Sequence, residues 1–149
     1  MKKQFALLTV VIVVLFASCR LNRSLVVVSS RDAPKAIGPY SQAIKTGDMI
    51  FTSGQIGLSP ATGALVGDDI TAQTQQALKN INAVLENAGA DMAHVVKATI
   101  FLKDLNDYAT VNDIYKTYFP EIKPARSTVQ VSRLPKDALI EIECTAVIK

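Results

Sequence analysis

The sequence predicts a single α+β domain in which two helices cover one face of one sheet. Two segments carry apolar residues at the 3.6-residue spacing of a helix, and six short β-like segments lie before, between and after them. No segment is repeated, so the predicted order is three strands, a helix, a strand, a helix and two strands. A chain of 149 residues is long enough for one substantial core but short for two domains.

Three strands are expected ahead of the first helix. They cover about residues 25–29, 41–45 and 49–53, and the Thr-Gly-Asp sequence at 46–48 supplies a turn between the second and the third. Residues 32–40 contain two prolines and one glycine. This composition favours an ordered connection over a helix or a strand.

The two helices are expected over residues 70–88 and 108–119. Asp69 can cap the first helix by accepting a backbone N–H, and Gly89 can end it. Asp107 is expected to cap the second helix, which stops before the following proline. The apolar stripe of the first helix, read as core, consists of Ala77, Leu78, Ile81, Val84, Leu85 and Ala88.

The remaining strands are expected at about residues 95–103, 127–131 and 139–148. The core-facing residues of the first of these are expected to be Val96, Ala98, Ile100 and Leu102. Phe101 and Val147 would then lie on the other face of the sheet. Exposed apolar side chains on that face would be unfavourable for a monomer, so we expect another subunit to cover them.

The charge distribution argues against nucleic-acid binding by the folded domain. All thirteen acidic residues lie at or after Asp32. Five of the sixteen basic residues precede Asp32, so eleven remain against thirteen acidic residues and the domain has a net charge of −2. Proteins that bind nucleic acid through its phosphates usually present a basic face.

The N-terminal segment predicts export. Residues 5–18 are mostly apolar and follow two lysines, and fourteen residues are too few to span a bilayer comfortably as a helix. The Phe-Ala-Ser-Cys sequence at 16–19 resembles a bacterial lipobox, in which Cys19 is acylated and becomes the new N-terminus. An uncleaved anchor and a simple signal cut near Ala17 are the alternatives.

The expected division of the chain has three parts. Residues 1–18 form a signal peptide, residues 19–31 comprise the lipidated cysteine and a tether, and residues 32–149 form the domain. The expected location is the bacterial cell envelope or periplasm, with the membrane contacted only through the N-terminal anchor.

The remaining cysteine and the single histidine are not expected to be catalytic. Cys144 shares strand parity with Ile140 and Ile142, so it should lie on the apolar face as a small hydrophobic residue. His94 precedes a strand, where a surface or capping role is expected. One histidine and no cysteine cluster leave no recognisable zinc site.

An arginine and a glutamate near the C-terminus are the leading candidates for chemistry. Arg126 lies in the Pro-Ala-Arg-Ser sequence at 124–127, and Glu141 lies in a strand-like run. Arginine can hold a carboxylate through two parallel hydrogen bonds, and glutamate can activate a water. Two adjacent strands joined by a turn at 134–137 would bring both into one cleft, which suits hydrolysis of a small acid. A structural salt bridge across a hairpin is the alternative.

Eight short segments, in order, resemble the Rid/YjgF family and within it the RidA group of reactive intermediate deaminases. The resemblance covers about residue 32 to the C-terminus. The segments are AIGPYS at 36–41, TSGQI at 52–56, VK at 96–97, KDL at 103–105, VN at 111–112, PARS at 124–127, LPK at 134–136 and IEIE at 140–143.

The resemblance implies a chorismate-mutase-like fold, with one mixed sheet of six to seven strands and two helices on one face. It also implies a homotrimer with sites between subunits, which hydrolyses 2-imino acids such as 2-iminobutanoate and 2-iminopropanoate to 2-oxo acids and ammonium. No metal or organic cofactor is implied. The family's carboxylate-binding arginine falls on Arg126 and its acid/base glutamate on Glu141. Its other substrate-binding positions fall on Tyr40, Ser53, Gly54, Asn112 and Thr128.

Each of these positions has a purely structural alternative. Tyr40 can fill the edge of the core, Ser53 and Gly54 can form a bulge, and Asn112 can be a polar residue early in a helix. Some family members carry a cysteine where this chain has Thr128, so thiol chemistry is excluded there. The threonine keeps the backbone carbonyl to which the role of that position is mainly assigned.

Two other functions compete with the enzyme. The same arginine cleft can belong to a binding module that captures a small carboxylate, such as a 2-oxo acid, without catalysis. Glu141 favours the enzyme, because a binding module does not need a carboxylate that repels its ligand. Some family members are described as ribonucleases or translation inhibitors, but the charge of −2 and the export signal argue against that function here.

Overall fold

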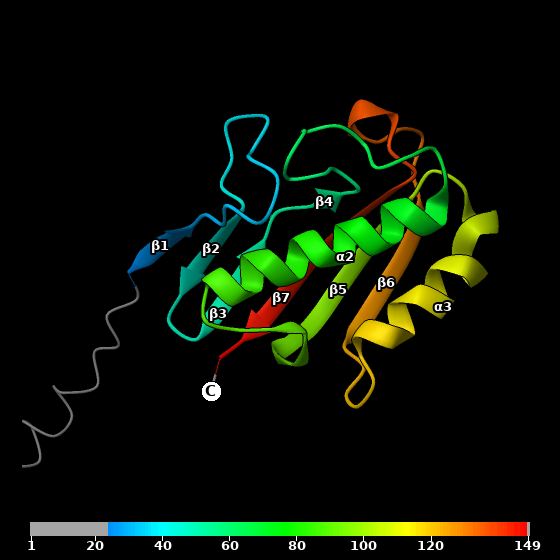
Figure 1. Ribbon diagram of the computed structural model, residues 1–149. Coiled ribbons are helices and arrows are strands. Elements are labelled where there is room, and N and C mark those ends of the chain that lie inside the picture. The colour runs from blue at the N-terminus through cyan, green and yellow to red at the C-terminus, as the bar shows by residue number, and fades with distance from the viewer. Residues whose placement is uncertain (1–23, 149) are drawn as a thin grey trace, which may run out of the picture.

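The computed structural model describes residues 24–148 and confirms the α+β class (Figure 1). One seven-stranded sheet has the order β1-β2-β3-β7-β5-β6, and β4 pairs with β7 beside that path. The sheet is mixed, because β6 pairs with β5 in parallel and the other pairs are antiparallel. The strands are β1 (Leu25–Val28), β2 (Ala43–Thr46), β3 (Met49–Thr52), β4 (Gln55–Ile56), β5 (Val95–Leu102), β6 (Ala125–Gln130) and β7 (Ile140–Val147).

Two helices, α2 (Ile70–Asn87) and α3 (Tyr108–Tyr118), lie side by side on one face of the sheet (Figure 1). The Asp69 carboxylate caps α2 by accepting the Ala72 N–H at 2.9 Å, as predicted. Gly89 follows the helix with a φ of +87°, a conformation that glycine adopts without strain. The sequence therefore determines both ends of α2 locally.

The predicted cap of α3 is wrong. The Asp107 side chain makes no capping hydrogen bond, because its backbone is already helical and continues a 3₁₀ turn, Leu105–Asp107. The cap belongs one turn earlier, where the Asp104 carboxylate accepts the Asn106 N–H at 2.9 Å.

The predicted orientation of Val96 is also wrong. The register of β5 against β7 shifts between Val95 and Lys97, which is the signature of a β-bulge. The shift makes Val95 part of the core and leaves Val96 47% exposed. Beyond the bulge, Ala98, Ile100 and Leu102 are fully buried, as the alternation predicts.

The sequence does not predict β4, a strand of two residues that is anchored to α2. Asn80 of α2 is fully buried, and its side-chain amide donates to the backbone carbonyls of Ile56 and Leu58 at 3.1 and 2.9 Å. Ile56 in turn pairs with Glu141 of β7. A polar residue inside an apolar helix stripe therefore fixes an irregular segment against the sheet.

The outer face of the sheet, away from the helices, is partly covered by the chain itself. Phe101 was expected to be exposed there, but it packs in a small second core cluster with residues of the β4 segment and the 134–138 turn. The apolar residues that stay open on this face lie elsewhere. Met49, Phe51 and Val129 are each about two-fifths exposed.

The sheet includes part of the segment assigned to the tether. Leu25–Val28 forms β1 and pairs with β2 from Leu25↔Thr46 to Val28↔Ala43. The expected signal peptide and Cys19 lie outside the described residues. Within residues 24–148, no helix is long and apolar enough to cross a membrane.

We expect Asn80→Ala to lower the free energy of unfolding by about 1–3 kcal/mol, since two buried carbonyls lose their donor. Urea denaturation would measure the change. Asn82→Ala on the same helix is the matched control, because the Asn82 amide binds Glu86 in an exposed position. Equal losses in the two variants would contradict the anchoring role of Asn80.

Candidate functional site

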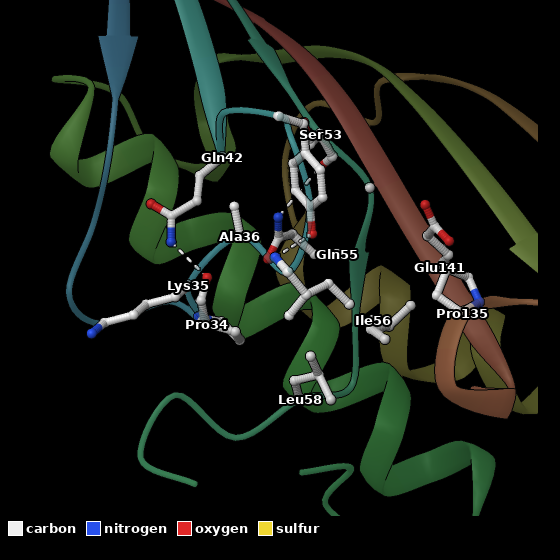
Figure 2. A pocket seen from close by; sticks show the side chains of 13 residues that line it. Pro34, Lys35, Ala36, Gln42, Ser53, Gln55, Ile56, Leu58, Pro135 and Glu141 are labelled. Carbon is white, nitrogen blue, oxygen red and sulfur yellow. Dashed lines mark hydrogen bonds between the residues drawn. The ribbon is translucent and has the colours of Figure 1, made fainter. Parts of the chain in front are cut away.

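A cavity of about 230 Å³ lies where the connection after β1 meets β4 and the start of β7. Glu141 and Pro135 line one side of it, and Pro34, Lys35 and Gln42 line another (Figure 2). Tyr40, Ser53 and Gly54, all predicted from the sequence, also line this cavity. Its other lining residues are Ala36, Ile37, Gln55, Ile56 and Leu58.

Local hydrogen bonds fix the two polar side chains that were predicted at the cavity. The Tyr40 hydroxyl accepts the Ile37 N–H at 3.1 Å, so the tyrosine closes its own loop. The Ser53 hydroxyl donates to the Ser41 carbonyl at 2.6 Å. The Ser53 hydroxyl is therefore engaged with the backbone, and Tyr40 keeps 46% of its surface exposed at the edge of the cavity.

Gln42 organises the loop over the cavity and is not among the residues predicted from the sequence. Its buried side chain accepts the Ser30 N–H at 2.6 Å and donates to the Pro34 carbonyl at 2.7 Å. These bonds satisfy backbone groups of a segment whose prolines cannot donate. One feature of the sequence could have indicated this role for Gln42. It is an amide side chain at the start of a strand, directly after a proline-containing connection.

Glu141 lies against Gly54 with no room for a side chain at that position. A Cβ built on Gly54 would lie 2.6 Å from the Glu141 carboxyl carbon and 2.8 Å from its Cγ. Real Cβ atoms do not approach this closely. Glycine is needed at position 54 for this close approach, and the Glu141 carboxylate rests on backbone at the cavity wall.

Burial raises the pKa of the Glu141 carboxyl above its ordinary value, and the nearby negative charge of Glu143 raises it further. Both effects disfavour the charged form. A carboxyl group with a raised pKa at a cavity wall holds a proton more readily than a free one, which suits proton exchange with a bound water or substrate.

The turn before β7 forms another part of the wall and has unusual backbone geometry. Lys136 and Asp137 both have φ near +57°, in the left-handed region that side-chain-bearing residues seldom occupy. The Asp137 carboxylate accepts two hydrogen bonds from the Arg133 guanidinium, at 2.7 and 3.1 Å. This ion pair ties the two ends of the turn together and so supports Pro135, which lines the cavity.

Arg126 lies in a different place, in an open groove between β6 and α3 that Asn112 and Tyr115 also line. Its Nη2 donates to the Asn112 side-chain oxygen at 2.7 Å and to the Tyr108 hydroxyl at 3.2 Å. The structure therefore brings Arg126 and Asn112 together, as a binding role for both requires. Tyr108 and Tyr115 were not predicted as site residues.

The expected hairpin that would unite Arg126 with Glu141 does not form. β5 lies between β6 and β7, so the two residues are on strands that are not neighbours. Arg126 pairs with buried Ala98 and faces the helices. Glu141 alternates with buried Ile140 and Ile142 and faces away from them. Within one chain the two candidates are on opposite faces of the sheet, and a salt bridge between them is excluded.

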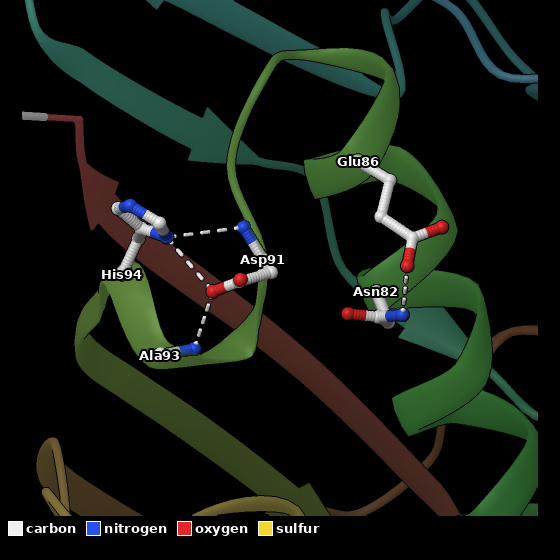
Figure 3. A network of polar contacts seen from close by, with 5 residues as sticks. All are labelled: Asn82, Glu86, Asp91, Ala93 and His94. Atoms are coloured by element: carbon white, nitrogen blue, oxygen red, sulfur yellow. Dashed lines mark hydrogen bonds and ion pairs between the residues drawn. The ribbon is translucent and has the colours of Figure 1, made fainter.

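The remaining candidates are outside the cavity. Thr128 faces the helix side, since it pairs with buried Ile100, and its buried hydroxyl has no partner among residues 24–148. Cys144 is 4% exposed, and burial raises its pKa to about 12, as fits the predicted core role. His94 caps a 3₁₀ turn with Asp91 (Figure 3). The described residues contain no cluster that could hold a metal ion.

Comparison with known proteins identifies the family. A family model described as Endoribonuclease L-PSP matches residues 30–148. The chain is 51% identical to a 2-iminobutanoate/2-iminopropanoate deaminase of Salmonella typhimurium, over 80% of this chain and 95% of that one. It is 53% identical to Reactive Intermediate Deaminase A, chloroplastic, of Arabidopsis thaliana, over 88% of this chain and 72% of that one.

Solved structures show the same fold. The YjgF gene product of E. coli superposes with a TM-score of 0.80 at 48% identity, covering 83% of this chain and 99% of that one. The class of protein defined by this fold is thus a small α+β domain with a cavity beside its mixed sheet. The chain belongs to the Rid/YjgF family.

Replacing Glu143 with Gln should lower the pKa of Glu141, because it removes the negative charge that disfavours ionisation. Carbon-detected NMR titration of the Glu141 carboxyl group would measure the pKa in the two proteins. Glu86→Gln, on the exposed side of α2, is the control and should leave that pKa unchanged. An unchanged or higher pKa in Glu143→Gln would contradict this account.

Proposed function

We propose that this protein is a deaminase that hydrolyses 2-imino acids to 2-oxo acids and ammonium without a cofactor. The observation that carries the proposal is the Glu141 carboxyl, which has a raised pKa and rests on Gly54 at the wall of the cavity. Relatives about half identical to this chain are named for this reaction. The reaction needs no polarising metal, because a protonated imine is already electrophilic.

The proposed chemistry has two proton transfers through one carboxylate. Arg126 binds the substrate carboxylate and fixes C2. Glu141 takes a proton from water as the water oxygen bonds to C2, which gives a carbinolamine. Glu141 then returns that proton to the nitrogen, and the C–N bond breaks. The hydroxyl passes its proton to the departing ammonia, so the 2-oxo group forms and ammonium leaves. Water and the iminium acid are thereby converted to the 2-oxo acid and ammonium in balance.

We propose that the complete site combines two chains of a homotrimer. Arg126 and Glu141 point from opposite faces of one sheet. The cavity and the groove of a single chain therefore each hold only part of the proposed site. The cavity half supplies Tyr40, Ser53, Gly54 and Glu141. The groove half supplies Arg126 and Asn112 with the backbone of Thr128. Burying the open apolar side chains Met49, Phe51 and Val129 favours this assembly.

The competing function is capture of a small carboxylate without turnover. It requires Arg126 but has no use for a proton-exchanging carboxyl group beside the ligand. The family description names an endoribonuclease. The domain from Asp32 onward carries a net charge of −2, which does not favour a phosphate-rich substrate.

We further propose that the protein faces the cell envelope, anchored through acylated Cys19. The support is the apolar run at 5–18 behind two lysines and the Phe-Ala-Ser-Cys sequence that follows. Cell fractionation of the full chain tests this, with Cys19→Ala expected to lose the membrane association. Recovery of both forms in the cytoplasm would exclude an envelope location.

The protein from Arg20 onward should hydrolyse 2-iminobutanoate generated in situ, detected as reduced trapping of the imine by semicarbazide. Arg126→Ala and Glu141→Gln should each abolish this activity, while both variants keep the wild-type thermal melting curve. No activity, with 2-oxobutanoate still bound through Arg126, would support the binding module instead.

Mixing the two inactive variants tests whether sites form between chains. When Arg126→Ala and Glu141→Gln subunits are unfolded together and refolded at equal amounts, about one quarter of two-chain sites contain both intact residues. Activity should therefore return to about a quarter of the wild-type value, with a trimer mass by light scattering. No recovery from mixed trimers would show that one chain supplies both groups.

Gly54→Ala should reduce turnover by about 10- to 100-fold, because the new methyl group displaces the Glu141 carboxylate. Only a flexible side-chain end has to move, so the melting temperature should change little. Gly57→Ala is the contrasting variant, since its Cβ would lie 2.7 Å from the Gln73 Cα in α2. It should lower stability, and the reverse pattern would contradict the placement of Glu141.

A further inference from the structure

Two tyrosines of α3 surround the guanidinium of Arg126. Residues 108, 112 and 115 are spaced four and three apart, so they share one face of the helix. The Arg126 guanidinium carbon lies 4.8 Å from the centre of the Tyr115 ring and 5.6 Å from that of the Tyr108 ring. Both distances are within the range of cation–π attraction.

The Arg126 guanidinium makes its hydrogen bonds to α3 through only one of its nitrogens. Nη2 donates to Asn112 at 2.7 Å and to the Tyr108 hydroxyl at 3.2 Å. Nε and Nη1 carry three further N–H groups, which find no acceptor among residues 24–148. The helix thus holds the arginine from one side and leaves donors available to a bound carboxylate.

Tyr115 contributes its ring, not its hydroxyl. Its side chain is 5% exposed, and its ring packs on Phe119 with centroids 4.5 Å apart. The Tyr115 hydroxyl is buried and has no hydrogen-bond partner in the described part of the chain. A ring fixed by packing on both sides is a rigid support for the guanidinium plane.

We propose that Tyr108 and Tyr115 are positioning residues that preorganise Arg126 for the substrate carboxylate. The inference rests on the proposed function, in which Arg126 binds that carboxylate. An unsupported arginine loses side-chain freedom when it binds, and this loss weakens affinity. Here the hydroxyl of Tyr108 and the ring of Tyr115 have already fixed the guanidinium before the substrate arrives.

The two tyrosines should affect substrate affinity more than turnover. The carboxylate contact is present both in the bound substrate and in the transition state, so loosening it acts mainly on KM. Removing one hydrogen bond or the supporting ring should raise KM about 3- to 10-fold with kcat largely retained. Binding of 2-oxobutanoate should weaken by a similar factor.

The experiment compares Tyr108→Phe and Tyr115→Leu with the wild type, using KM and kcat for 2-iminobutanoate and calorimetric titration with 2-oxobutanoate. Tyr115→Phe restores the ring and should recover most of the affinity lost in Tyr115→Leu. Tyr118→Phe is the matched control on the same helix, because the Tyr118 hydroxyl binds the Gln75 carbonyl, away from Arg126. Its KM and Kd should equal those of the wild type.

Unchanged KM and Kd in both Tyr108→Phe and Tyr115→Leu would overturn the proposal. A fall in kcat and melting temperature at constant KM would also overturn it, since that pattern indicates a purely structural role. If the wild type hydrolyses no imine, the proposed reaction fails. The titration with 2-oxobutanoate then still decides the positioning role, because it measures carboxylate binding alone.

Discussion

The alternation of side chains across a β-strand is the constraint on which the candidate site depends. Successive residues of a strand point to opposite faces, and pairing across the sheet carries this parity from strand to strand. Buried Ala98 fixes Arg126 on the helix face, and buried Ile140 and Ile142 fix Glu141 on the other. No local rearrangement can reverse one of them without exposing a row of core residues. This parity leads us to place the two halves of the site on different chains.

The cavity half depends on segments with little regular structure, each held by one buried polar side chain. Gln42 holds the connection that carries Tyr40, and Asn80 holds the segment that carries Ile56. Gln73 does the same for the start of β7, because its side-chain oxygen accepts the Leu139 N–H at 2.8 Å. Buried side-chain amides form hydrogen bonds with backbone groups that have no partner in a neighbouring strand. The surroundings of Glu141 are thus fixed by three buried amides, each of which holds a neighbouring segment.

Local patterns predicted most of the fold. The ends of α2 follow from Asp69 and Gly89, and the core positions of β5 and β7 follow from alternation. Local patterns do not predict the structure where the controlling interaction is not local. The bulge at Val96 exists only in the pairing with β7, and β4 is too short to show a period. The adjacency of strands also depends on the whole topology, so the hairpin expected between 127–131 and 139–148 was wrong.

The candidate site residues also divide into those that sequence motifs predicted and those that they did not. Tyr40, Ser53, Gly54 and Glu141 were predicted as cavity residues from their motifs, and the structure gathers them in one cavity. Gln42, Tyr108 and Tyr115 lie outside the quoted motifs, so no motif marks them. The separation of Arg126 from Glu141 was not predicted, because alternation within each strand does not show which faces of two different strands coincide. That correspondence depends on the strand order and register.

The buried thiol of Cys144 can report transient opening of the sheet. The thiol is in the middle of β7, its backbone N–H donates to the Thr52 hydroxyl at 2.9 Å, and burial raises its pKa to about 12. A thiol with such a pKa does not react with alkylating reagents while the sheet is closed. In the chain from Arg20 onward it is the sole cysteine. The rate at which it becomes labelled therefore reports how often the centre of the sheet separates, under conditions where the protein is otherwise native.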